Sequence, residues 1–368
     1  MKTLKELMEI ELSKIPYVSF SQIEEFITDD KRSASFISSI TDGLQYNVPD
    51  DNNALYMVAQ VRARHSAISF LLGLSFMKFG KLYENVGTAI DSDGKDINYR
   101  LWLMTSLNHD RAYSSERLMD HSLNIKKTYQ PYLLDTNYND ETLSPLDNFE
   151  MNYPTYYAYS SKTIEAYDAY SRGYHTRRSK INSELERIDH GILGGAILFQ
   201  EMVKKYRKSN LSDPCELLII KASGVSIAQH NIYKSPNKEI DKYYESIGCL
   251  EQLFSTSDYR ITKETPLLLL LSLVDTIECV KRFSKGNNSS SSLETLTVLK
   301  AVKADVTAEE LTLDFSSLRE AILEKRNSDK LLDEFNKHLN AIKTINTWTE
   351  VEVDDCENED IICLKIRS

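Results

Sequence analysis

The chain has 368 residues, 41% of them hydrophobic, and its 44 basic and 55 acidic side chains give a formal charge of −11. This length and apolar content predict a substantial core, with room for one large domain and a smaller one. The acidic balance excludes a surface that coats nucleic acid generally, but it leaves room for a local site that binds a phosphate group.

The first 20 residues and the most apolar stretch both argue against a membrane role. MKTLKELMEIELSKIPYVSF predicts an amphipathic helix, with charges too frequent for a secretory signal. PLLLLLSLVDTIECV, from Pro266, reaches an aspartate after nine residues and is too short to span a bilayer. The five cysteines show no C-x-x-C spacing, which suits reduced thiols. We therefore expect a cytoplasmic protein that does not bind membranes.

Helical periodicity dominates up to about residue 284. Within 54–85, apolar residues recur at spacings of three and four, and one stripe contains Val58, Val61, His65, Ile68 and Leu72. His65 is therefore expected to face the core. Further helices are expected at 99–108, 190–207, 215–230, 239–254 and 266–283.

The pattern changes after SKGNNSSSS, residues 284–292, which has the composition of a linker. Strand signals follow in TLTVLKAV, EELTLDF, TWTEVEVDD and DIICLKI, with two helical segments near 316–345. The prediction is a mainly α fold, in which a helical domain at 1–284 is followed by a small α+β C-terminal domain at 293–368.

A long irregular insertion is expected at about 131–180. It is dense in tyrosine and turn-forming residues, and it ends in the basic residues Arg172, His175, Arg177, Arg178 and Lys180. Long insertions in compact domains are usually functional or disordered. The sequence leaves open whether this one is a lid over a site or a solvated loop.

Six polar residues are not explained by the apolar pattern, because each lies on or at the end of an expected helix. They follow the order H, HD, H, H, D and are His65, His109, Asp110, His190, His230 and Asp275. A single core-facing histidine is ordinarily a hydrogen-bonding residue, but five helices could bring this set to one pocket. Imidazoles with shared carboxylates suit first-row transition metals, and six donors are enough for two ions.

This order of residues resembles the HD superfamily of metal-dependent phosphohydrolases. The resemblance covers residues 50–284 and is most specific in DHGILGGAIL, which is similar to a segment of the HD nuclease domains attached to CRISPR helicases. It implies that the helical domain is an HD-domain bundle. The chain departs from the common H-D-x-G-K pattern at Arg111 and Ala112, and AQHNIY has one histidine where some members have two.

The resemblance also implies a role for each residue. His65, His109, Asp110 and Asp275 would hold one metal ion, and Asp110, His190 and His230 a second. Asp110 would bridge the ions and is the catalytic candidate, while Gly191, Gly194 and Gly195 would let their helix pack close to the site. The expected cofactor is one or two divalent ions of Mn, Fe, Co, Ni or Zn, with Mg as a further candidate.

Phosphoester hydrolysis is the chemistry that such a site implies, because two ions lower the pKa of a bridging water and the resulting hydroxide attacks phosphorus in line. The expected substrate is a nucleotide or a cyclic dinucleotide. Its phosphate would be bound by basic residues, for which the candidates are Arg111, Arg172, His175, Arg177, Arg178 and Lys180. Two alternatives remain: a metal-dependent single-strand nuclease, which the net charge does not favour, and a non-catalytic regulatory protein that binds metal or nucleotide.

Overall fold

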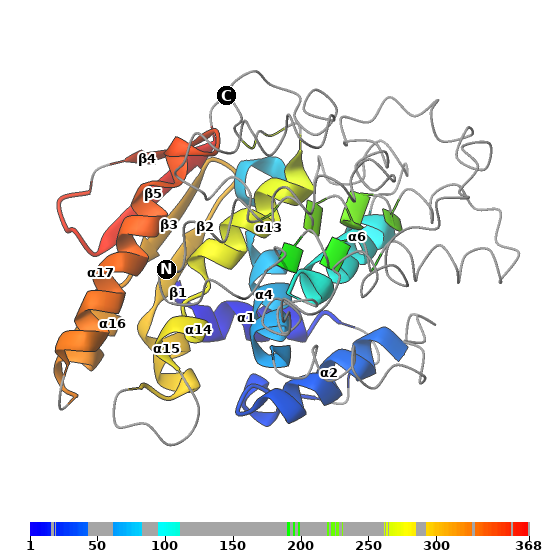
Figure 1. Ribbon diagram of the computed structural model, residues 1–368, viewed down its shortest axis with the longest axis horizontal. Helices are drawn as coiled ribbons and strands as arrows, with labels where there is room; N and C mark the ends of the chain where they lie inside the picture. Colours follow the sequence, from blue (N-terminus) through cyan, green and yellow to red (C-terminus); the bar gives the residue numbers. More distant parts are fainter. Residues whose placement is uncertain are drawn as a thin grey trace, which may run out of the picture. The chain divides into compact units, whose positions relative to one another are not determined.

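The computed structural model (Figure 1) describes part of the chain and divides it into two compact units. The first unit comprises Met1–Asn85 with Ile261–Ser368, and the second comprises Val86–Arg260. The described residues are 1–15, 18, 20–42, 62–82, 95–110, 190–191, 194–195, 198, 219–220, 222–224, 226–227, 230, 261, 263, 265–284, 292–325, 328–354 and 356–366.

The described part of the chain is mainly helical, as expected, with a small antiparallel sheet formed largely near the C-terminus. Among the described residues of the first unit, the α-helices are α1 (Leu4–Leu12), α2 (Asp30–Asp42), α4 (Ala63–Phe76), α13 (Pro266–Ile277), α14 (Val280–Phe283), α15 (Thr295–Ala301), α16 (Ser316–Leu323) and α17 (Asp329–Lys343). Short 3-10 turns are η1 (Ile23–Glu25), η2 (Phe79–Lys81) and η8 (Ile345–Thr347). Among the described residues, no helix is long and apolar enough to cross a bilayer.

The sheet joins the two ends of the described chain. Its strands are β1 (Lys2–Thr3), β2 (Lys303–Val306), β3 (Glu310–Asp314), β4 (Val351–Asp354) and β5 (Ile361–Ile366), in the antiparallel order β1-β2-β3-β5-β4. Lys2 lies opposite Ala304, so the first residues of the chain extend a sheet built some 300 positions later. The expected linker at 284–292 consequently falls inside the first unit.

One strand signal was wrong. TLTVLKAV was expected to be extended, but Thr295–Ala301 forms helix α15. Thr295, Val298 and Leu299 are buried, a spacing of three and four that places them on one helical face. Packing of this face outweighs the preference of β-branched residues for strands. The strand β2, with the sequence KADV, follows directly and carried no strand signal.

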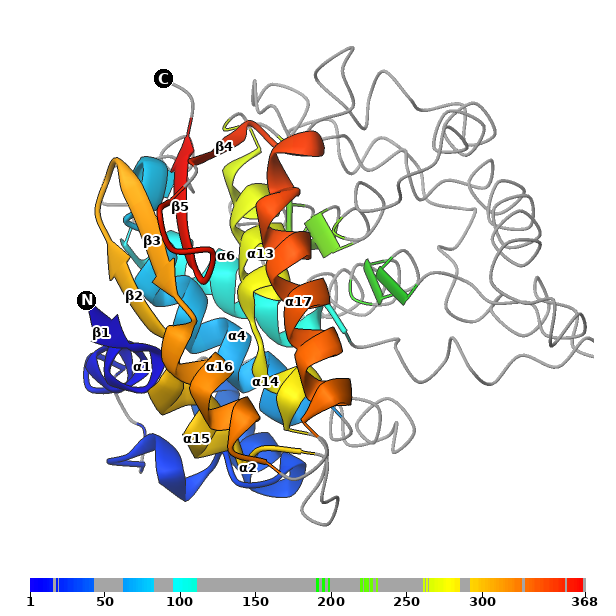
Figure 2. The same ribbon diagram turned by 90° about the vertical axis from the view of Figure 1, so that its left-hand side faces the viewer.

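The helix that carries His65 lies in the core of the first unit. Helix α4 packs against α1, α2 and α13, and Figures 1 and 2 show α4 and α13 side by side. Beyond α4 the chain turns at Gly80, which has a positive φ of 60° and donates its N–H to the carbonyl oxygen of Ala308 at 2.8 Å. The left-handed conformation favours glycine, so this turn ties the end of the α4 segment to the sheet.

Two expected helices differ from their observed bounds. The stretch 266–283 is not continuous, because α13 ends at Ile277 and α14 begins at Val280. In the second unit, α6 spans Lys95–Asn108. The described positions at 190–198 and 219–227 are helical, while the helix expected at 239–254 lies outside the described residues.

His338 on α17 is a buried imidazole that should make stability depend on pH. Its ring lies edge-on to those of Phe283 and Phe315, with centroids 5.8 and 5.7 Å away. Burial, followed by the positive charge of Arg282, lowers the pKa of His338 from 6.5 to about 3. His338 therefore binds a proton near pH 6.5 in the unfolded chain but only near pH 3 in the folded chain. The contribution of the neutral imidazole to stability is complete above pH 6.5 and is lost as the pH falls towards 3.

We predict that this histidine alone costs the protein about 2 kcal/mol of unfolding free energy between pH 7 and pH 5. Urea unfolding of the wild type and of His338→Phe, which keeps a flat ring but cannot titrate, measures the effect. The wild type should lose more stability than the variant across this interval. Parallel pH profiles would contradict the prediction.

Candidate metal centre

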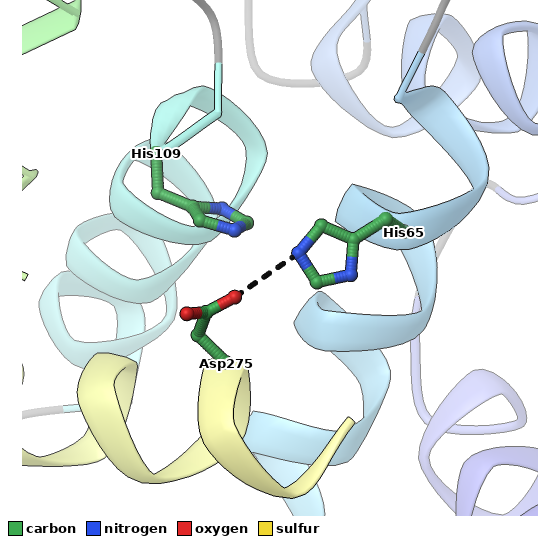
Figure 3. A group of neighbouring side chains, drawn as sticks. All are labelled: His65, His109 and Asp275. Carbon is green, nitrogen blue, oxygen red and sulfur yellow. Dashed lines mark ion pairs between the residues drawn. The ribbon is translucent and has the colours of Figure 1, made fainter. Parts of the chain in front are cut away.

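The imidazole of His65 is held between two acidic side chains from the end of α13. Its Nδ1 atom lies 2.7 Å from Oε2 of Glu278, and its Nε2 atom lies 3.3 Å from Oδ1 of Asp275. Figure 3 draws the second of these contacts as a dashed line. All three side chains are buried. The carboxylate of Glu278 therefore orients the ring through Nδ1, while the carboxylate of Asp275 faces Nε2.

The charges of this buried group favour a cation beside His65. Burial and the charge of Lys281 act to lower the pKa of His65, but the hydrogen bonds to Asp275 and Glu278 outweigh them and raise it. Burial acts to raise the pKa of Glu278, whereas its hydrogen bond with His65 lowers it overall, so this carboxylate is ionised. Carboxylates at both ring nitrogens require positive charge between them, which a proton or a metal ion at Nε2 would supply.

Glu278 and Lys281 also belong to this group, although the pattern of residues in the sequence did not predict either of them. Glu278 accepts hydrogen bonds from the backbone N–H groups of Val280, at 2.6 Å, and Lys281, at 3.3 Å. The ammonium group of Lys281 donates to the backbone oxygen of Asp275 at 2.7 Å and also to its Oδ1 atom. The sequence LVDTIECV places Asp275 and Glu278 about one helical turn apart, and this spacing was the signal that could have found Glu278.

In the second unit, His109 and His230 are oriented by the same kind of local hydrogen bond to the backbone. Nδ1 of His109, which follows α6 directly, lies 2.6 Å from the carbonyl oxygen of Ser106. Nδ1 of His230 lies 2.6 Å from the carbonyl oxygen of Ile227. Each ring thus bonds the carbonyl three residues earlier, at the end of a helical turn where carbonyls lack helical partners. This places the proton on Nδ1 and leaves the lone pair on Nε2, the nitrogen that could bind a metal ion.

Three side chains from separate stretches of the sequence meet in the second unit. Nε2 of His190 lies 3.1 Å from Oδ1 of Asp110, and the rings of His190 and His230 have centroids 5.3 Å apart. Asp110, His190 and His230 each offer a ligand atom, and these atoms all lie within 4.8 Å of one another. The ring of His109 stands edge-on to that of His230, with centroids 5.4 Å apart. A carboxylate grouped with imidazoles is a donor set suited to first-row transition metals.

Gly191 permits the close approach of His190 and His230. A Cβ atom at this position would lie 2.7 Å from the carbonyl oxygen of Ile227 and 2.9 Å from both Cε1 and Nδ1 of His230. No ordinary side chain tolerates such distances to a backbone atom. The helix that presents His190 can therefore lie against the turn that presents His230 only if residue 191 is glycine. Gly194 and Gly195 are buried helical residues.

The six expected ligands fall into two groups, one in each unit. His65 and Asp275 lie together in the first unit, and the other four lie together in the second: His109, Asp110, His190 and His230. That the two groups form one centre stays a prediction. The insertion at 131–180 and the expected phosphate-binding residues lie outside the described residues; the latter are Arg111, Arg172, His175, Arg177, Arg178 and Lys180.

Replacing Glu278 should weaken metal binding through His65. Glu278→Leu removes the acceptor that orients the ring, and the affinity for Mn²⁺ should fall by about 10–100-fold, as is typical for partners behind a metal ligand. Glu278→Gln keeps one acceptor oxygen and should fall between this variant and the wild type. Calorimetric titration with Mn²⁺ measures both. Equal affinities in all three proteins would show that Glu278 has no such role.

Replacing Gly191 by alanine should displace His230, lower the unfolding free energy by about 1–3 kcal/mol through overpacking and weaken Mn²⁺ binding. Urea unfolding and metal titration give the two values. Gly80→Ala is the matched control, because it strains a left-handed turn in the first unit without touching an expected ligand. If Gly191→Ala bound Mn²⁺ as tightly as Gly80→Ala, the close approach would not serve the metal site.

Comparison with known proteins adds no family to these observations. No protein-family model, no curated protein and no solved structure matches this chain.

Proposed function

We propose that this protein is an HD-type metal-dependent phosphohydrolase that cleaves a phosphoester of a nucleotide or cyclic dinucleotide. The observation that carries the proposal is the cluster of Asp110, His190 and His230, whose ligand atoms lie within 4.8 Å of one another. Its members come from distant parts of the sequence and are almost entirely enclosed. Burying a carboxylate among imidazoles is costly unless a cation or a set of hydrogen bonds compensates it.

The proposal assigns His65, His109 and Asp275 to a second set of ligands, with Asp110 shared between the two sets. It is supported in the first unit by the pairing of His65 with Asp275 and in the second by the unprotonated Nε2 atom of His109. When bound, divalent ions would lower the pKa of a water molecule and withdraw charge from phosphoryl oxygens.

Neighbouring groups of the chain would hold the proposed imidazole ligands in a fixed orientation. Glu278 holds the ring of His65 from behind, and the carbonyls of Ser106 and Ile227 do the same for His109 and His230. Rigid donors hold bound oxygen atoms in one geometry and so reduce the reorganisation needed during reaction. Lys281 neutralises part of the acidic charge, because it already bonds Asp275.

A nucleotide-like substrate is favoured by the sequence of the insertion between Asp110 and His190. Its tyrosines offer flat faces for a base, and its basic end offers guanidinium groups for phosphate. The overall charge of −11 opposes the long basic track that a nuclease acting on single strands would use. This contrast places a small substrate ahead of a polynucleotide.

Asp110→Ala should separate metal binding from general folding. Removing the shared ligand should lower the metal content of the purified protein by at least half and reduce phosphoesterase activity by about 100-fold or more. Elemental analysis and turnover with Mn²⁺ measure the two effects. Asp333→Ala is the control, since Asp333 is an exposed acid paired with Lys337. An Asp110→Ala protein with full metal and full activity would refute the mechanism.

Arg178→Ala should affect the substrate rather than the metal. The variant should keep the metal content of the wild type, raise KM by about 10-fold and change kcat less, because a charge-assisted contact to phosphate is lost. Loss of metal from this variant, or an unchanged KM, would remove Arg178 from the substrate site.

A substrate screen distinguishes the proposed function from its alternatives. The metal-loaded protein is incubated with nucleotides, cyclic dinucleotides and short single-stranded oligonucleotides in the presence of Mn²⁺, and the products are separated by chromatography. Hydrolysis of small substrates supports the proposal, whereas cleavage confined to oligonucleotides supports a nuclease. Tight nucleotide binding without any product would indicate a non-catalytic regulatory protein.

A further inference from the structure

Two cysteine side chains meet where the edge strand β4 pairs with β5, one in β5 and one in the loop that joins the two strands. Cys363 lies in β5 opposite Asp354, the last residue of β4. Cys356 follows β4 by two residues, and its Sγ atom lies 2.9 Å from that of Cys363. Both side chains are partly exposed. A reagent in solution can therefore reach a pair of sulfurs that the hairpin already holds together.

The distance between these sulfurs favours a covalent bond over a shared metal ion. A disulfide has an S–S length of about 2.05 Å, so the sulfurs need to approach by only about 1 Å. Two thiolates on one tetrahedral zinc ion, each at about 2.3 Å, would lie about 3.8 Å apart. Among the described residues, the groups of histidine, cysteine and acidic side chains able to hold a metal do not include this pair.

We propose that Cys356 and Cys363 are a modification site, at which oxidation by a low-molecular-weight disulfide forms a reversible intrachain disulfide across the β4–β5 loop. Cys279 provides the contrast. It is almost fully buried, and burial raises the pKa of its thiol well above the usual value. The sequence alone gave no reason to separate Cys356 and Cys363 from the other cysteines, because they are seven positions apart and form no short motif.

Oxidation of the two thiols consumes one molecule of oxidised glutathione. The thiolate of one cysteine attacks the glutathione disulfide, forms a mixed disulfide and releases one glutathione thiolate. The second cysteine then attacks the protein sulfur of that mixed disulfide and releases the other glutathione. The two protein thiols lose two electrons and two protons, which the two glutathione molecules carry away.

Both cysteines are free thiols in the structure. The hydrogen bond with Cys363 raises the pKa of Cys356 to about 11, so at neutral pH this thiol keeps its proton. Closing the bond would tie the end of the edge strand β4 to its neighbour β5. A disulfide stabilises a protein mainly by lowering the entropy of the unfolded chain, and this effect is small for a short loop. The expected gain is therefore a rise in Tm of a few degrees.

The test uses the full-length protein in mixtures of reduced and oxidised glutathione. Free thiols are blocked by alkylation after equilibration, and peptide mapping by mass spectrometry identifies every disulfide. We expect one linkage, between Cys356 and Cys363, that disappears when excess reduced glutathione is added. The single variants Cys356→Ser and Cys363→Ser should instead retain a stable mixed disulfide with glutathione, and Cys279→Ser should behave as the wild type.

Three results would overturn the proposal. The first is complete alkylation of both thiols after equilibration with oxidised glutathione alone. The second is a linkage from either cysteine to Cys215, Cys249 or Cys279 in place of the expected one. The third is zinc that co-purifies with the protein and is lost in both Cys356→Ser and Cys363→Ser, because this would make the pair a metal site.

Discussion

The first unit depends on the hydrogen bond between His65 and Glu278, because this contact joins two helices that are more than 200 residues apart in sequence. A carboxylate buried without partners costs several kcal/mol, so an acid at position 278 must be compensated. The imidazole supplies one partner, and the backbone N–H groups just after α13 supply two more. These donors are free to bond the side chain because the helix is interrupted there. The break in the helix and the orientation of the histidine are thus two results of one buried charge.

The second unit orients its imidazoles by a different means. His109 and His230 bond carbonyl groups of their own chain three residues earlier, so neither needs a distant acidic partner for its Nδ1 atom. Such a contact forms as soon as the local turn forms. The ring of His230 instead needs room beside the helix that carries His190, and Gly191 leaves this room because it has no side chain. Local contacts therefore set ring orientation here, and close packing sets the distances between rings.

The sequence predicted the parts of the fold that are governed by one strong pattern. The apolar run of α13, the amphipathic helix α17 and the strands β3 and β5 follow from periodicity. Helix α15 was mistaken for a strand, since its β-branched composition conflicted with the spacing of its buried residues. The break at Glu278 was not foreseen, because the buried contact of its carboxylate is with a histidine 213 positions away in the sequence.

The candidate site was predictable in composition but not in detail. Histidines and aspartates on apolar helices stand out because their burial needs a reason, and among the described residues Asp110, His190 and His230 do lie together. Glu278 and Lys281 were missed because they lie just beyond the conspicuous Asp275 and act through side-chain contacts. The nearness of Cys356 and Cys363 also needed the structure, since strand register alone decides which residues of a hairpin meet.

The sheet that pairs Lys2 with Ala304 has a consequence for synthesis on the ribosome. The first unit is discontinuous, with the whole of Val86–Arg260 translated between its two parts. Its N-terminal helices therefore emerge long before the strands and helix α13 that cover them. The hydrogen bond between His65 and Glu278 can form only after residue 278 has been synthesised. The second unit is continuous and can begin to fold earlier. During translation, the buried apolar residues of α4 therefore lack these packing partners for the time needed to make nearly 200 residues.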